Sequence, residues 1–271
     1  MRSFQAASIG AAGVALAGTA ALTAWGAHIT TPYASVRGAA PPRPSPLPGP
    51  VPPMALPVSG LARSMPLYTA PQPDIITRAR WGADESLRDK GTHYADAVRT
   101  VVLHHTDTGN AYDCSQVPGM IRNLYTGHVK DRGWGDIAYN FLIDKCGTIY
   151  EGRAGGIERP VIGAHTVGFN NETMGVAAIG TFPAGTTVPQ DMIDAIAKLS
   201  AWKLGLSGTD PRGHTRLTST SDASRYHKGR SAVFKVISGH RDGFFTDCPG
   251  RALYDRLPEI RAQAARIQGR R

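Results

Sequence analysis

The sequence predicts an α/β domain in which helices pack on the faces of a central β-sheet. Short apolar runs rich in β-branched residues alternate with longer segments whose apolar residues recur at helical spacing, a pattern typical of alternating strands and helices. These segments follow a proline-rich stretch that cannot form a hydrogen-bonded core. We therefore expect the globular domain of this 271-residue chain to span residues 74–271.

The N-terminal part of the chain has the composition of an export signal followed by a spacer. Residues 1–27 begin with a positive charge at Arg2 and continue with an apolar run and small residues, the layout of a secretory signal peptide. An uncleaved membrane anchor is the alternative. Residues 28–73 carry frequent prolines and are expected to form an extended, semi-rigid linker.

Hydrophobic periodicity predicts the elements of the domain. Apolar runs predict strands over 98–103, 139–143, 148–151, 174–179 and 232–237, with 139–143 and 148–151 paired as a hairpin. Helices are expected over 115–128 with Ser115 at the N-cap, over 189–204, and over 251–268 with an interruption near Pro258. The polar stretch within 206–239 is expected to be a surface excursion or hairpin inserted before the strand 232–237.

The chain has a formal net charge of +9, which favours a polyanionic partner. Nucleic acid is the weaker interpretation because the basic residues are dispersed and no recognised nucleic-acid motif is present. An anionic cell-wall polymer fits better. Solubility alone remains an alternative explanation of the charge.

Histidine and cysteine residues at the predicted strand ends are candidates for a metal site. His104 and His105 end one strand, His240 follows another, and Cys248 comes eight residues later. Zinc binds imidazole nitrogen and thiolate, and a catalytic site uses three protein ligands and leaves a fourth position to water. Hydrogen-bonded structural histidines are the alternative. The chain contains no His-Glu-x-x-His helix, no Cys-x-x-Cys pair and no Gly-x-Ser-x-Gly elbow, which argues against the commoner zinc and serine sites.

The three cysteines, Cys114, Cys146 and Cys248, are an odd number in a chain expected to leave the cytoplasm. Such a count suggests one disulfide bond and one thiol with another role.

Several blocks occur in an order that resembles the peptidoglycan recognition protein and type 2 N-acetylmuramoyl-L-alanine amidase family, in particular its secreted actinobacterial branch. The blocks are 80–83 (RWGA), 101–106 (VVLHHT), 133–141 (GWGDIAYNF), 147–153 (GTIYEGR), 163–166 (GAHT), 239–242 (GHRD) and 246–250 (TDCPG). The resemblance implies a central mixed β-sheet flanked by helices, with a zinc-containing, L-shaped substrate groove.

The resemblance also implies the site residues. It places one zinc ion on His104, His240 and Cys248; neighbouring strand residues point to opposite faces, so only one of His104 and His105 can easily face the metal. Cys114 and Cys146 then remain as a disulfide pair. Tyr139 and Thr246 match catalytic positions beside the zinc-activated water. His165, Arg153 and Asn170 match groove positions that bind substrate.

The function implied is hydrolysis of the amide bond between N-acetylmuramic acid and the L-alanine of the peptidoglycan stem peptide, by a secreted, wall-associated monomer. A non-catalytic peptidoglycan-binding module on the same fold is the alternative. A structural protein with a fold-stabilising zinc ion is disfavoured because structural zinc usually takes four protein ligands.

Overall fold

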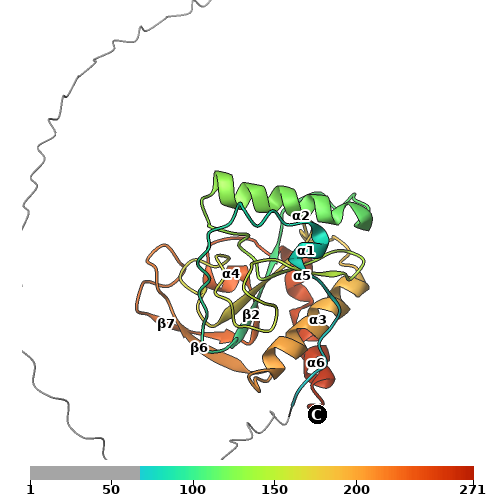
Figure 1. The fold of residues 1–271 in the computed structure, drawn as a ribbon. Coiled ribbons are helices and arrows are strands. Elements are labelled where there is room, and N and C mark those ends of the chain that lie inside the picture. Colours follow the sequence, from blue (N-terminus) through green and yellow to red (C-terminus); the bar gives the residue numbers. More distant parts are fainter. Residues whose placement is uncertain (1–67) are drawn as a thin grey trace, which may run out of the picture. The chain divides into compact units, whose positions relative to one another are not determined.

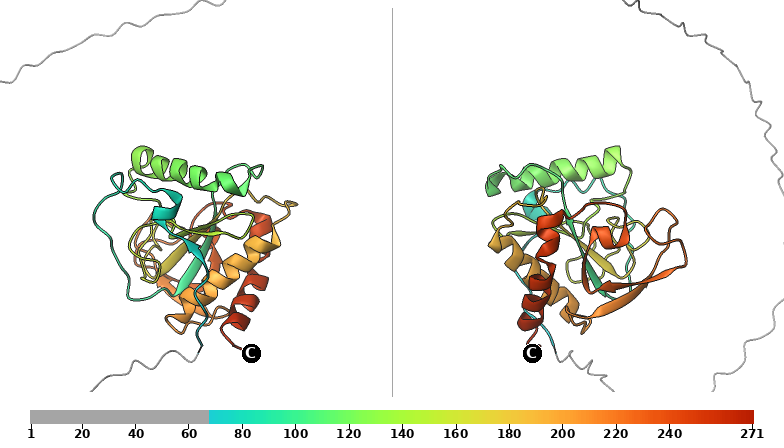
Figure 2. Two further views of the ribbon diagram at one scale, coloured as in Figure 1. Left: turned by 45° about the vertical axis from the view of Figure 1, so that its right-hand side comes forward. Right: turned by 180° about the vertical axis from the view of Figure 1, so that it is seen from behind.

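The structure is a computed structural model that describes residues 68–271 (Figures 1 and 2). The expected signal peptide, residues 1–27, and residues 28–67 of the expected linker lie outside the described residues. No helix in the described part of the chain is long and apolar enough to cross a membrane.

A six-stranded mixed sheet forms the centre of the domain. Its spatial order is β1 (Ile75–Ile76), β4 (Ile149–Glu151), β3 (Phe141–Ile143), β5 (Thr173–Ala178), β2 (Thr100–His105) and β8 (Ile237–Gly239). All neighbouring pairs are parallel except the hairpin of β3 and β4. The predicted mixed sheet and its hairpin are confirmed.

The strands of this sheet have two buried faces. In β2, Val101 and Leu103 point into the core beneath α3 (Gln190–Gly205) and α6 (Leu257–Ile267). On the other face, Leu142 and Ala177 pack in the core beneath α2 (Val117–Thr126). Figure 2 shows α2 on one side of the sheet and the C-terminal helices on the other. Burial on both faces explains why the strands are continuous apolar runs in the sequence.

The predicted helices are present, but their first and last residues differ from the predicted ones. The helix expected from Ser115 is preceded by a 3₁₀ turn, Cys114–Gln116, and the N-cap is Asp113, whose carboxylate accepts the Ser115 N–H at 2.8 Å. The same helix continues into a π-helical turn over Gly127–Asp131. At the C-terminus, α5 (Arg251–Asp255) and α6 are separated at Arg256, and Pro258 lies in the first turn of α6, where it needs no amide hydrogen.

The prediction of a single strand over 232–237 is wrong. The structure divides it into β7 (Ser231–Lys235) and β8, separated by Val236. β7 pairs with β6 (His214–Thr218) in a separate antiparallel hairpin, and only β8 enters the central sheet. Val236 is itself buried, so the hydrophobic run continues across the break and conceals it in the sequence. The short elements α1 (Arg78–Trp81), α4 (His240–Gly243) and β1 were not predicted.

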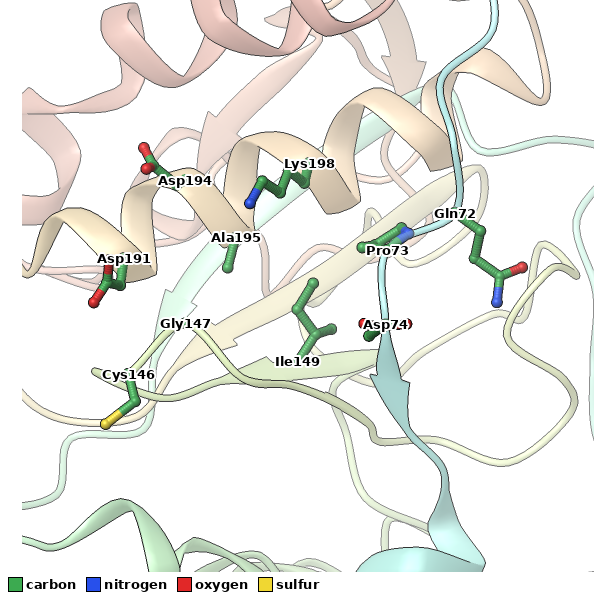
Figure 3. Close-up of a pocket in the computed structure, with 10 residues that line it drawn as sticks. All are labelled: Gln72, Pro73, Asp74, Cys146, Gly147, Ile149, Asp191, Asp194, Ala195 and Lys198. Carbon is green, nitrogen blue, oxygen red and sulfur yellow. The ribbon is translucent and has the colours of Figure 1, made fainter.

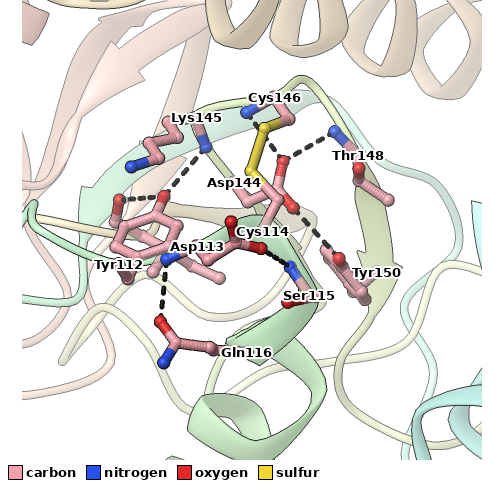
Figure 4. The surroundings of a disulfide bond; sticks show 11 residues. Tyr112, Asp113, Cys114, Ser115, Gln116, Asp144, Lys145, Cys146, Thr148 and Tyr150 are labelled. Carbon is pink, nitrogen blue, oxygen red and sulfur yellow. Dashed lines mark hydrogen bonds between the residues drawn. A yellow bond between two sulfur atoms is a disulfide. The ribbon is translucent and has the colours of Figure 1, made fainter.

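A disulfide bond joins Cys114, at the start of the α2 segment, to Cys146, in the β3–β4 turn (Figure 4). The buried Asp144 carboxylate organises that turn, since it accepts the N–H groups of Cys146 and Thr148 and the Tyr150 hydroxyl at 2.9–3.0 Å. The predicted pairing is confirmed, and it links the helix to the hairpin that follows Tyr139.

We predict that Cys114→Ala/Cys146→Ala lowers the free energy of unfolding by about 3–4 kcal/mol, because the bond closes a loop across 32 positions and restricts the unfolded chain. Urea denaturation of the two proteins measures this difference. Mass analysis of non-reduced peptides should find Cys114 linked to Cys146 and Cys248 unlinked. Equal stability of the two proteins, or any disulfide that contains Cys248, would contradict the prediction.

Candidate metal centre

Three side chains from separate parts of the chain meet beside the central sheet. His104 lies in β2, His240 begins α4 directly after β8, and Cys248 lies in the loop before α5. One potential ligand atom from each lies within 4.8 Å of the other two. Parallel pairing of β2 with β8 places the carboxyl ends of both strands together, which explains why residues 136 positions apart in the sequence are neighbours.

The geometry of this triad fits a zinc ion. Cys248 Sγ lies 3.7 Å from His104 Nδ1, and a nitrogen and a sulfur bound to one tetrahedral zinc ion lie about 3.6 Å apart. His240 Nε2 is buried and has no hydrogen-bond partner in the described part of the chain. Such a nitrogen fits a metal ligand, since buried polar atoms are otherwise nearly always hydrogen-bonded.

Backbone hydrogen bonds hold Cys248 in place. Its sulfur accepts the His105 N–H at 3.3 Å, and its carbonyl accepts the Arg241 N–H at 3.0 Å. The Thr246 hydroxyl oxygen accepts the Cys248 N–H at 3.1 Å. Thr246 therefore shapes the cysteine loop, whatever further role it has.

Burial sets the protonation of the cluster. It lowers the pKa of His104 well below the usual value and that of His240 to about 4, so both imidazoles are neutral near pH 7 and each has a free lone pair. Burial also raises the pKa of the Cys248 thiol to about 12. A thiolate at this position therefore requires a nearby cation.

His165 lies behind His104 and is itself buried. Its Nδ1 is 3.0 Å from His104 Nε2, its Nε2 is 3.3 Å from the Thr173 hydroxyl oxygen, and that hydroxyl donates to the Phe169 carbonyl at 2.6 Å. A Cβ atom at Gly175 would collide with the His165 ring, so this glycine leaves the space that the ring occupies. The sequence indicated His165 as a groove residue, whereas the structure places it in direct contact with His104.

His105 points to the opposite face of β2 from His104, as strand alternation requires. It is partly exposed and lines a pocket of about 570 Å³ together with Asp107, Arg241, Thr246 and Cys248. Cys248 belongs both to this pocket and to the triad. Only the backbone of His105 contacts the triad, through its N–H bond to Cys248 Sγ.

Tyr139 lies beside the triad, two residues before β3 begins. Its ring centroid is 5.2 Å from that of His104 and 5.6 Å from that of His128. Burial raises the pKa of its hydroxyl, which is therefore protonated near neutral pH and can donate a hydrogen bond. His128 Nδ1 accepts the Ala138 N–H at 3.1 Å and thereby fixes the backbone before Tyr139.

Arg153 and Asn170 make structural contacts in this part of the domain. Arg153 donates to the carbonyls of Ile137 and Trp134 at 3.0 and 3.3 Å, and so holds the segment that leads to Tyr139. Asn170 Oδ1 accepts the N–H groups of His165 and Thr166, both at 2.8 Å.

A buried ion pair supports the same segment. The Asp136 carboxylate contacts Arg78 at 3.2 Å and accepts the N–H groups of Ile137 and Ala154. Four residues of this region were not predicted as site residues from the sequence: Asp136, Arg78, His128 and Thr173. Only Asp136 lay within a family block, and nothing in the sequence distinguished any of them from surface polar residues.

Two other features in the described part of the chain are poor candidates for catalysis. Cys114, Asp144 and Cys146 also lie close together, but both sulfurs are in the disulfide bond. Figure 3 shows a pocket of about 480 Å³ between α3 and the segment before β1, with the side chains of Asp191, Asp194 and Lys198 on the helix. This pocket contains no histidine and no free cysteine.

Solved structures share this fold. Drosophila PGRP-LB superimposes with a TM-score of 0.53 at 26% identity, covering 68% of this chain and 92% of that chain. PGRP-LE in complex with tracheal cytotoxin, described as monomeric diaminopimelic acid-type peptidoglycan, superimposes with a TM-score of 0.53 at 27% identity, covering 68% of this chain and 92% of that chain.

Proteins of the same family are also similar to this chain in sequence. Peptidoglycan-recognition protein SC2 of Drosophila melanogaster is 28% identical over 183 residues, which are 68% of this chain and 84% of the relative. The N-acetylmuramoyl-L-alanine amidase of Homo sapiens is 29% identical over 189 residues, which are 68% of this chain but only 28% of the relative. Residues 94–251, more than half of the chain, match the Amidase_2 family, described as N-acetylmuramoyl-L-alanine amidase. The chain therefore belongs to this amidase family.

Proposed function

We propose that this protein is a zinc-dependent N-acetylmuramoyl-L-alanine amidase, which hydrolyses the amide bond between N-acetylmuramic acid and the L-alanine of the stem peptide. The observation that carries the proposal is the meeting of His104, His240 and Cys248 within 4.8 Å, beside an open pocket. Three ligands are the number that a catalytic zinc site uses.

The known relatives support both the substrate and the reaction. PGRP-LE has been solved with a peptidoglycan fragment, and the human relative is named as an amidase. Family membership by itself supports either peptidoglycan binding or amide hydrolysis. We favour hydrolysis because a pure binding module has no need of a buried thiol and two neutral imidazoles that converge on one point.

His104, His240 and Cys248 would hold the zinc ion. Bound zinc supplies a Lewis acid that polarises the amide carbonyl and lowers the pKa of the attacking water. A His104 ring that presents Nδ1 to the metal must carry its proton on Nε2, where His165 Nδ1 accepts it. His165 in turn donates from Nε2 to Thr173, so this chain of hydrogen bonds fixes both rings.

Tyr139 and Thr246 are the proposed catalytic side chains. Water adds to the amide carbonyl carbon, negative charge develops on the carbonyl oxygen, and the C–N bond then breaks as the amine takes up a proton. The protonated Tyr139 hydroxyl can donate to that developing charge. The Thr246 hydroxyl oxygen accepts the Cys248 N–H, and the hydroxyl hydrogen can still donate to the attacking water and orient it.

We propose that the scissile amide lies against the triad and Tyr139, and that the rest of the substrate extends into the adjoining pocket lined by Thr246 and Cys248. We propose that His165, Arg153 and Asn170 also bind substrate. The backbone hydrogen bonds of Arg153 and Asn170 support a role in shaping the wall of the substrate groove. We also propose that the protein is exported by its N-terminal segment and acts as a monomer at the cell wall.

Metal analysis tests the proposal most directly. Protein purified without chelator should contain about one zinc ion per chain, and Cys248→Ser should lose most of the metal and the activity because serine is a poor zinc ligand. Elemental analysis and release of N-terminal L-alanine groups from purified peptidoglycan measure the two quantities. The matched control, Cys114→Ser/Cys146→Ser, also loses cysteines and should keep its zinc. A metal-free protein with full activity would refute the mechanism.

Tyr139→Phe separates catalysis from packing, because it keeps the ring and removes the hydroxyl. Turnover should fall roughly a hundredfold or more, with zinc content, peptidoglycan binding and melting temperature nearly unchanged. Tyr150→Phe is the matched control: its hydroxyl bonds Asp144, away from the triad, so its loss should lower stability and spare turnover. Unimpaired hydrolysis by zinc-loaded Tyr139→Phe would remove Tyr139 from the catalytic residues. If every variant binds peptidoglycan and even the parent never cleaves it, the protein is a binding module.

Substitution of His165 distinguishes metal positioning from substrate binding. His165→Leu should weaken zinc affinity roughly ten- to hundredfold, because His104 loses its orienting partner. His165→Asn keeps an acceptor near the position of Nδ1 and should recover part of that affinity. Competition with a chromogenic chelator measures it, and His214→Leu, an exposed histidine on β6, serves as control. A raised KM with zinc affinity equal to that of the parent would instead indicate substrate binding.

A further inference from the structure

A strongly basic pocket lies between the β6–β7 hairpin and the C-terminal helices. It has a volume of about 260 Å³, and four cationic side chains line it together with a single acidic one. The cations are Arg225, Lys235, Arg241 and Arg261, and the acid is Asp242. They come from the loop before β7, from β7 itself, from α4 and from α6, so the tertiary structure alone assembles them (Figures 1 and 2).

Asp242, the acidic residue of this pocket, accepts two hydrogen bonds from neutral groups. Asp242 Oδ2 accepts the Gly239 N–H at 2.9 Å, and Oδ1 accepts the Tyr254 hydroxyl at 2.7 Å. Within residues 68–271, Arg225, Lys235 and Arg261 form no ion pair, and the only ion pair of Arg241 is with the exposed Asp247, at 3.8 Å. The pocket therefore has four cationic side chains and one carboxylate, an excess of positive charge.

The charge continues from the pocket along the outer face of the hairpin. Leu217, Ala232 and Phe234 form the inner face, which packs on Phe169 in a small core of its own. The alternate residues point outward, and there His214 stands opposite Lys235 and Arg216 opposite Val233. No acidic residue occurs in either strand. Arg216 and Lys235 therefore have no acidic neighbour in either strand, and an anionic ligand would relieve the repulsion between them and the cations of the pocket.

We propose that this pocket and the outer face of the hairpin bind a phosphodiester polymer, of the polyol-phosphate kind that carries one negative charge per repeat. Three of the four cations in the pocket are arginines, whose planar guanidinium groups match the oxygen atoms of phosphate in bidentate geometry. A polymer fits better than a single anion, because the cations extend from the pocket onto the outer face of the hairpin. Such binding would retain the protein at an anionic surface independently of the proposed amidase activity.

The test measures the affinity of the full-length chain for synthetic poly(glycerol phosphate) at low ionic strength. Arg225→Gln/Lys235→Gln should weaken binding by about tenfold or more, since each basic side chain near an anionic surface contributes a sizeable attraction. Arg80→Gln/Lys90→Gln removes the same net charge from exposed residues near α1 and should weaken binding by less than about threefold. Arg225→Lys/Lys235→Arg keeps both charges and should bind as the parent does.

Four outcomes would overturn the proposal. They are no binding by the parent, equal weakening in the two glutamine variants, equal binding of poly-L-glutamate, which shows a preference for charge alone, and tighter binding of single-stranded DNA through the same residues. Melting temperatures check that the variants fold. If Arg225→Gln/Lys235→Gln is unstable, Arg216→Gln/Lys235→Gln replaces it, because both of these side chains are exposed on the strands.

Discussion

The parallel pairing of β2 with β5 on one side and with β8 on the other is the constraint on which the rest of this domain depends. It buries every residue of β2 except His105, directs Leu103 into the core beneath α3 and α6, and turns His104 to the opposite face. It also places the end of β8, and therefore His240, next to His104. A shift of β2 by one residue would exchange the faces of His104 and His105 and separate the triad.

Burial gives the triad its chemical character. Two imidazoles removed from water stay neutral, and a thiol removed from water stays protonated unless a cation is bound. The three residues therefore offer two neutral nitrogens and one ionisable sulfur, the donor set that the proposed zinc site uses. His165 contacts His104, and Thr173 contacts His165. The orientation of the proposed ligand His104 therefore depends on side chains that do not reach the metal.

Several interactions fix the segment from Trp134 to Tyr139 next to the triad. Arg153, His128 and the Arg78–Asp136 pair all bond to its backbone or to its side chains, and the disulfide bond fixes the turn at the far end of β3. A tyrosine that donates to a developing charge must be preorganised, because reorganisation at the moment of reaction raises the barrier. Rigid support around Tyr139 is therefore consistent with the role proposed for its hydroxyl.

The resemblance to the amidase family, and not a local pattern, predicted the mixed sheet, the three proposed metal ligands and the Cys114–Cys146 pairing. The sequence by itself determined the elements with strong hydrophobic periodicity. Local pattern suffices there, because burial on one or two faces imposes its period on the chain. Only the tertiary structure decided that 232–237 is two strands, that His165 contacts His104, and that Arg225, Lys235, Arg241 and Arg261 share a pocket. These features depend on contacts between distant segments and on the loss of solvent around each side chain, and neither leaves a local pattern in the sequence.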